Sequence, residues 1–130
     1  MVGEMALDKL LAGIQPRLLP GEYVFCSVPS NRYGDKVELS PLASYQEEEG
    51  LSLLLPREHA DKEGLEYGSI LRGITLSVHS SLDAVGFTAA VTRKLAEKGI
   101  PANVIAAHYH DHIFVPTDQA ALALKLLAEF

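Results

Sequence analysis

The chain has 130 residues, of which 48% are hydrophobic and 22% charged, and its formal net charge at pH 7 is -6. This composition is typical of a globular protein with a packed core and excludes a disordered chain. The acidic balance, without a basic cluster to offset it, argues against the backbone of a nucleic acid as partner. No stretch approaches the roughly 18 apolar residues of a membrane span, and the first residues lack the basic start of a signal peptide. Together with a single cysteine, Cys26, which cannot form an internal disulfide, this predicts a cytoplasmic protein.

The first half of the chain is predicted to contain a helix, three strands and a second helix, in that order. The predicted ranges are 4–13 for the first helix, 23–28, 45–48 and 51–55 for the strands, and 57–64 for the second helix. Between the first two strands, residues 30–41 are polar and rich in turn formers, which predicts a surface loop.

The next stretch, residues 71–99, predicts a strand that leads through a polar loop into a helix. Alternating Ile74, Leu76 and Val78 indicate the strand, and His79-Ser80-Ser81 form the polar connection. Apolar residues then recur at helical spacing, and Gly99 suits the left-handed residue that ends a helix. A strand that passes through a small loop into a helix N-terminus exposes unpaired backbone N–H groups, which favour a carboxylate or another anion.

The remaining residues predict a hairpin and a final helix. Residues 102–109 read as a strand, His110-Asp111-His112 as a tight turn and residues 113–115 as the partner strand. Thr117 or Asp118 is predicted to cap a last helix that ends near residue 129.

Several of these segments together resemble a known family. The strand, the loop, the Val85-Gly86-Phe87 start of the helix and the end at Gly99-Ile100 resemble an ACT domain, a small regulatory module. VHSSLDAVGFTAA followed by ANVIAAHYHDHIFVP resembles small bacterial stand-alone proteins with two ACT-like halves and the ACT pairs of eukaryotic arginine sensors. Val85 stands where the general ACT pattern has proline, so the similarity is to this subfamily.

The resemblance implies an α+β fold of tandem ACT-like, ferredoxin-like βαββαβ modules, with helices on one face of antiparallel sheets. We place an N-terminal ACT-like half at residues 1–68 and a C-terminal ACT domain at residues 69–130. Each half lacks one strand of the full pattern, and the run at residues 69–78 is long enough to serve both. We therefore expect the sheets to be completed between the halves or between chains, and we expect a homodimer.

The resemblance also implies a non-catalytic regulatory protein that binds a small molecule, most plausibly an amino acid, and that needs no cofactor. The predicted ligand-binding residues are His79, Ser80, Ser81, Leu82, Asp83, Val85, Gly86 and Asn103. The alternative is a structural or interaction module that dimerises or docks on a partner without a ligand.

The cluster His108-Tyr109-His110-Asp111-His112 leaves two interpretations open. Alternate strand positions put His108 and His110 on one face, as in some metal sites. Imidazoles at the tip of a hairpin diverge when the chain reverses, however, and no further cysteine or glutamate completes a ligand spacing. The sequence favours a solvated turn, and we predict no metal site.

Other reactive side chains have simpler interpretations. Ser80 and Ser81 stand beside His79, but adjacent residues point apart and no nucleophile elbow is present, so helix capping is favoured over catalysis. Cys26 is expected in the core, His59 on the surface, and residues 47–49, three consecutive glutamates, in a solvated turn.

Overall fold

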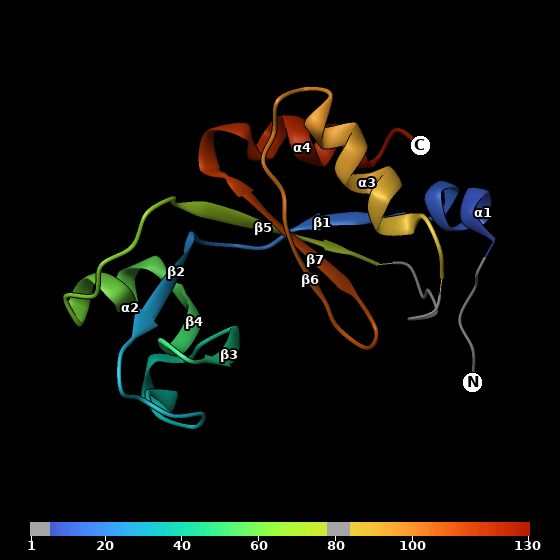
Figure 1. Ribbon diagram of the computed structural model, residues 1–130. Helices are drawn as coiled ribbons and strands as arrows, with labels where there is room; N and C mark the ends of the chain where they lie inside the picture. The colour runs from blue at the N-terminus through green and yellow to red at the C-terminus, as the bar shows by residue number, and fades with distance from the viewer. Residues whose placement is uncertain (1–5, 78–83) are drawn as a thin grey trace. The chain divides into compact units, whose positions relative to one another are not determined.

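The computed structural model describes residues 6–77 and 84–130. The chain divides into two compact units, which we call unit 1 (residues 1–20 and 72–130) and unit 2 (residues 21–71). In each unit antiparallel strand pairs are combined with helices (Figure 1). The predicted α+β class is therefore confirmed.

Unit 1 has a four-stranded sheet in the order β1-β5-β7-β6, covered on one face by helices (Figure 1). In chain order its elements are α1 (Leu7–Ala12), β1 (Pro16–Leu18), β5 (Leu71–Leu76, which begins at the last residue of unit 2), α3 (Phe87–Ala96), β6 (Asn103–Ala106), β7 (Asp111–Pro116), the single 3-10 turn η2 (Thr117–Gln119) and α4 (Ala120–Leu127). This is the ferredoxin-like strand order, with β1 at the edge where the fold has its last strand.

The sequence pattern did not predict β1, which supplies the strand that the C-terminal half lacks. Pro16, Arg17 and Leu18 lie opposite Leu76, Thr75 and Ile74 of β5. The Leu19 N–H then donates to the Gly73 carbonyl at 2.8 Å. Three residues beginning with proline are too short to show alternation, so this strand is defined by its partner and not by its own composition. The expectation that one part of the chain completes the sheet of another is thus confirmed.

The core of unit 1 lies between the sheet and its helices. Ile74 and Leu76 on β5 face the buried side of α3, where Phe87, Val91 and Leu95 recur at helical spacing. Helix α3 ends as predicted, with Gly99 in the left-handed region (φ 70°) and the Ile100 N–H donating to the Leu95 carbonyl at 3.0 Å. These contacts fix the packing of α3 on the sheet and the position at which the helix ends.

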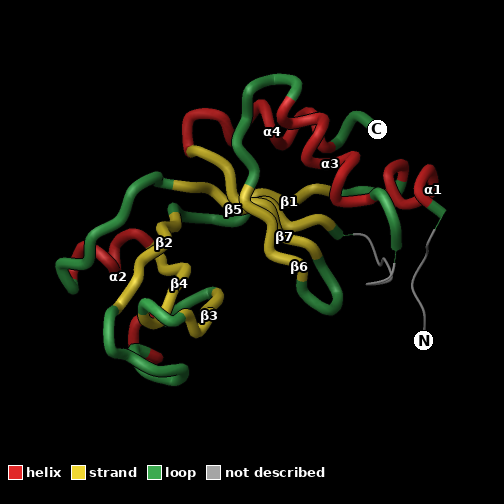
Figure 2. The backbone as a smooth tube through the Cα atoms, in the orientation of Figure 1, coloured by secondary structure: helices red, strands yellow, loops and turns green. Residues whose placement is uncertain are grey.

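Unit 2 has the strand order β3-β4-β2 (Figure 2). Leu71 pairs with Tyr23 at the far edge of β2. Its elements are β2 (Tyr23–Val28), the 3-10 turn η1 (Val37–Leu39), β3 (Ala43–Glu47), β4 (Gly50–Pro56) and α2 (Arg57–Lys62). With Leu71 as the start of the last strand, the order of elements is again βαββαβ, except that one 3-10 turn replaces the first helix. Alternate residues of β2 and β4 form its core with Leu39 and Ala60.

Three predicted segments differ from the structure. Thr117 and Asp118, predicted to cap the last helix, lie in the 3-10 turn η2, and the N-cap of α4 is Gln119, without a side-chain cap hydrogen bond. The predicted surface loop at residues 30–41 contains η1, which is flanked by Lys36 and Ser40 in left-handed conformations (φ 63° and 54°). The predicted hairpin turn was placed too late: the Ala107 N–H donates to the His110 carbonyl, so the chain reverses over residues 107–110, and Asp111 and His112 belong to β7. None of the described helices combines the length and apolarity needed to cross a membrane.

Candidate functional site

The start of α3 is the part of the predicted ligand loop that the structure describes. Strand β5 ends at Leu76 and α3 begins at Phe87. The predicted ligand residues His79, Ser80, Ser81, Leu82 and Asp83 lie outside the described residues. Val85 and Gly86 are described, and together they form the last step before the helix.

Gly86 is the N-cap residue of α3 and has a left-handed backbone (φ 94°). A side chain is disfavoured at this φ, and glycine adopts it without steric cost. Because glycine has no side chain, the cap residue supplies no acceptor to the N–H groups of the first turn. The Gly86 carbonyl accepts from the Ala90 N–H at 2.9 Å, so the helix proper begins here.

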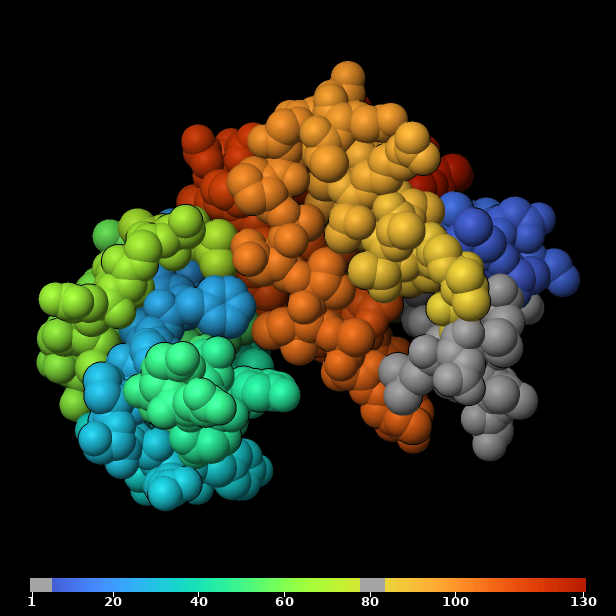
Figure 3. Space-filling view, in the orientation of Figure 1, coloured from blue at the N-terminus to red at the C-terminus, as the bar shows by residue number. Residues whose placement is uncertain are grey.

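The surroundings of Gly86 are apolar. Val85, next to it, is 85% exposed, which is high for a large aliphatic side chain. A methyl group built on Gly86 would lie 3.4 Å from Cδ2 of Leu7, at the start of α1. The start of α3 therefore combines N–H donors with apolar surface from α1 and from the loop itself. The space-filling view shows α3 and the β6–β7 hairpin, in yellow and orange, on the surface of unit 1 (Figure 3).

Asn103 begins β6, one residue after the predicted start of that strand, and β6 is an edge strand of unit 1. Its side-chain Nδ2 donates to the Phe114 carbonyl on β7 at 3.1 Å. The structure thus gives this amide a role in holding the hairpin together. Strand β7 separates β6 from β5, so Asn103 and the start of α3 are not brought together by adjacent strands.

The histidine cluster is divided by the hairpin turn. The His108 and Tyr109 rings stack edge to face in the turn, with centroids 4.7 Å apart, and Tyr109 is 67% exposed. His112 lies on β7, and its Nδ1 is 3.0 Å from Oγ1 of Thr75 on β5. No three His, Cys, Asp or Glu side chains among residues 6–77 and 84–130 converge as metal ligands would.

The charge states at the start of β7 are shifted by burial. Burial of the ring lowers the pKa of His112 below its ordinary value, and the neighbouring His110 and Arg17 lower it further, against an opposing effect of Asp111. Burial also raises the pKa of Asp111, which the nearby His112 partly offsets. Thr75, the partner of His112, is a buried polar residue, 2% exposed.

The other reactive side chains are structural in this arrangement. Cys26 is 3% exposed in the core of unit 2, and burial raises the pKa of its thiol. His59 was expected on the surface, but it is half-buried, and its Nδ1 lies 2.6 Å from the Leu39 carbonyl in η1. An open hollow beside α2 is lined by Glu58, His59, Asp61 and Lys62, all from that one helix.

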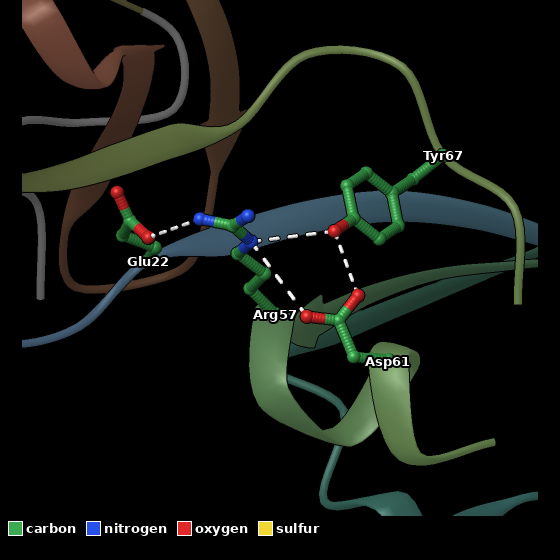
Figure 4. A network of polar contacts seen from close by, with 4 residues as sticks. All are labelled: Glu22, Arg57, Asp61 and Tyr67. Carbon is green, nitrogen blue, oxygen red and sulfur yellow. Dashed lines mark hydrogen bonds and ion pairs between the residues drawn. The ribbon is translucent and has the colours of Figure 1, made fainter. Parts of the chain in front are cut away.

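A polar network around Arg57 was not predicted from the sequence (Figure 4). Arg57 Nη1 contacts Oε1 of Glu22 at 2.9 Å, and its Nε donates to the Tyr67 hydroxyl at 3.3 Å. That hydroxyl donates to Oδ1 of Asp61 at 2.7 Å. The pKa of Arg57 is raised, mainly by the hydrogen bonds of its guanidinium to Tyr67 and Glu22. Tyr67 and Glu22 are 10 and 35 residues away from Arg57 in the sequence, so no local motif indicates the network. The network connects α2 to the segment before β2 and to the segment after α2.

Comparison with known proteins gives two family matches and several structural neighbours. Two family models, both described as ACT domain, match residues 2–72 and 69–129. The chain is 50% identical to a protein of unknown function from Vibrio cholerae, described as a possible transport protein, with a TM-score of 0.87 over 95% of this chain and 94% of that chain. No curated protein matches the chain.

Two further solved structures show a likeness of fold alone. A protein from Agrobacterium tumefaciens is 18% identical, with a TM-score of 0.71 over 88% of this chain and 87% of that chain. The ligand-free regulatory subunit of aspartate kinase from Thermus thermophilus is 9% identical, with a TM-score of 0.60 over 88% of this chain and 96% of that chain.

Proposed function

Because this chain belongs to the ACT domain family, with two matches in tandem, we propose that it is a non-catalytic regulatory protein that binds an amino acid at the loop between β5 and α3. The observation that carries the proposal is the start of α3 at Gly86, a left-handed N-cap without a side-chain acceptor. The regulatory subunit of aspartate kinase, which has this fold, supports a regulatory role for the module.

The N–H groups of the first turn of α3 hold the carboxylate of the ligand. They lie at the positive end of the helix dipole, and Gly86 has no side-chain acceptor that would occupy them. A carboxylate bound to several N–H groups forms charge-assisted hydrogen bonds, which are about twice as strong as neutral ones. The exposed Val85 and the apolar Leu7 supply contact for an aliphatic or aromatic ligand side chain.

The remaining predicted residues complete the site in this proposal. In it, His79, Ser80, Ser81 and Leu82 contribute to binding the carboxylate, and Asp83 binds the ammonium group. Asn103 contributes its amide from a paired module, since a homodimer would bring a second copy of β6 to the loop. A ligand that binds between two modules favours the assembly in which they are paired, and in this way it can regulate without being chemically changed. The proposal includes a cytoplasmic location, in keeping with one buried, unpaired cysteine.

The test is a thermal-shift screen of the purified protein against the twenty amino acids, with two variants of the cap residue. Gly86→Ala imposes the backbone strain alone, whereas Gly86→Asp adds a carboxylate that occupies the N–H groups itself. We expect one amino acid to raise the melting temperature of the wild type and of Gly86→Ala but not of Gly86→Asp. A ligand at 100 times its Kd stabilises a protein by about 2.7 kcal/mol, which such a screen detects. The proposal fails if no amino acid shifts the wild type.

A second candidate function is docking through a sheet edge. Strand β3 is the edge strand of unit 2, four of its five residues are exposed, and the Tyr45 side chain is 75% exposed. Such an edge offers unpaired backbone groups to another chain. Sedimentation of the wild type beside Gln46→Pro, a variant in which proline blocks edge pairing, distinguishes the two: docking without a ligand predicts a ligand-independent dimer that the proline abolishes.

A further inference from the structure

A row of polar side chains crosses three adjacent strands of unit 1, away from the start of α3. Arg17 on β1 lies opposite Thr75 on β5. Oγ1 of Thr75 lies 3.0 Å from Nδ1 of His112, on the next strand, β7. The rings of His110 and His112 have centroids 6.1 Å apart. The buried hydroxyl of Thr75 thus contacts His112 directly, with Arg17 opposite Thr75 in the strand register and His110 beside His112.

The charges around His112 are mostly positive. Arg17 from β1 and His110 from the hairpin turn both disfavour a charged imidazole at His112, and the one group that favours it is Asp111. Strand β6 contributes an apolar partner, Ile105, opposite His112. The described residues contain two ion pairs between side chains, and Arg57 forms both, with Glu22 and with Asp61. Among the described residues the guanidinium of Arg17 thus has no ion-pair partner, and the carboxyl group of Asp111 is the group of opposite sign that acts on His112.

We propose that Arg17, Thr75 and His112 form a binding site for a small oxyanion, a carboxylate or a phosphate group. The guanidinium of Arg17 provides a planar pair of donors that matches either group. Arg17 is exposed and His112 half-buried, so an anion can reach the donors from solvent while Thr75 holds the imidazole in place. The site shares no residue with the proposed amino-acid site.

Binding at this site is coupled to proton uptake by His112. When the imidazole of His112 is neutral, the Thr75 hydroxyl can donate to Nδ1, and its hydrogen is then not available to another acceptor. In the charged imidazole Nδ1–H donates to Oγ1 instead, so the Thr75 hydroxyl keeps its hydrogen and is free to donate it in a hydrogen bond to the anion. Burial is the main cause of the lowered pKa of His112, and an anion between Arg17 and His112 offsets the repulsion that lowers this pKa further. By thermodynamic linkage, the factor by which the anion favours protonation of His112 equals the factor by which protonation of His112 strengthens binding of the anion.

The test is the pH titration of the histidine ring signals by NMR, in chloride and in sulfate or acetate at equal ionic strength. Sulfate stands for a phosphate dianion and does not itself titrate near neutral pH, and acetate stands for a carboxylate. We expect one of them to raise the pKa of His112 by about one unit, as a bound opposite charge does. That shift corresponds to about tenfold tighter binding to the protonated form. The anion with the larger effect identifies the chemistry of the ligand.

Three variants assign the effect to this site. Arg17→Gln should abolish the shift, whereas Arg93→Gln, which removes an equal charge from the exposed side of α3, should leave it. Gly86→Asp blocks the start of α3 and should also leave it, which separates this site from the proposed amino-acid site. The inference is overturned if His112 titrates identically in all three salts, or if its shift survives Arg17→Gln.

Discussion

Gly73 is the position in unit 1 where the smallest substitution has the clearest predicted cost. It lies on β5 under the ring of Phe114, which is completely buried on the neighbouring strand β7. A methyl group built on Gly73 would lie 2.7 Å from Cε2 of Phe114 and 3.0 Å from Cδ1 of Leu19. Ordinary contact begins at 3.4 Å, so the ring must move by about 0.7 Å within a packed core. Gly73→Ala is therefore an overpacking substitution.

The magnitude follows from two opposing effects. Overpacking of a core costs about 1–3 kcal/mol. Alanine stiffens the unfolded chain relative to glycine, which returns about 0.5–1 kcal/mol. The difference is about 0–2.5 kcal/mol, and for a clash of 2.7 Å with a completely buried ring we expect Gly73→Ala to lower the free energy of unfolding by about 1–2 kcal/mol, within that range. Urea unfolding followed by circular dichroism measures this, which suits a chain without tryptophan.

Gly68→Ala is the matched control, because a methyl group there meets no atom within 4 Å and the backbone is not left-handed. It should leave stability unchanged or slightly raised. In a Phe114→Leu background the cost of Gly73→Ala should shrink, since leucine leaves room for the methyl group. Equal stability of Gly73→Ala and Gly68→Ala would show that Phe114 does not pack on the glycine, and would refute the reasoning.

Three further predictions concern single side chains. Burial and positive neighbours lower the pKa of His112 below its ordinary 6.5, so the unfolded state binds this proton more readily than the folded state. The contribution of His112 to the free energy of unfolding should therefore be fully present above about pH 6.5 and be lost as the pH falls through the folded-state pKa. His112→Gln should flatten this pH dependence in urea unfolding curves recorded from about pH 5 to 8. Cys26 should react with a thiol reagent far more slowly in the native protein than in urea, and an unchanged rate would place it at the surface. Tyr67→Phe removes the hydroxyl that bridges Arg57 and Asp61 and should cost about 1 kcal/mol or less, since the Asp61 end is solvated; a loss above about 2 kcal/mol would mean that the network is buried.

The sequence predicted those elements whose own side chains define them. Strand β2 was predicted at its observed bounds, and helix α3 was predicted from Phe87, Val91 and Leu95, all of which are buried. The predicted resemblance to ACT modules in tandem is confirmed by the two family matches. These elements have strong periodicity or distinctive glycines, and such local signals can be recognised without knowing which strand or helix each element packs against.

The elements that the sequence did not predict depend on distant partners. Strand β1 has three residues and exists because Arg17 and its neighbours pair with β5, about 60 residues later. The hairpin turn was misplaced because Asp111 and His112 resemble turn residues, while the register of β6 on β7 puts them in the strand. The Arg57 network and the contact of His112 with Thr75 join residues far apart in the chain, so no pattern of spacing marks them. The ligand assigned to residues 79–86 and Asn103 stays a prediction.

The central claim is that the start of α3 binds the carboxylate of an amino acid. The most direct measurement is a backbone amide NMR titration with the amino acid that stabilises the protein most in the thermal screen. The account predicts saturable shifts of the Phe87, Thr88 and Ala89 amides, at the first turn of α3, with loss of these shifts in Gly86→Asp and their retention in Gly86→Ala. Shifts confined to the edge strands β3 and β6, with the first turn of α3 unchanged, would contradict it.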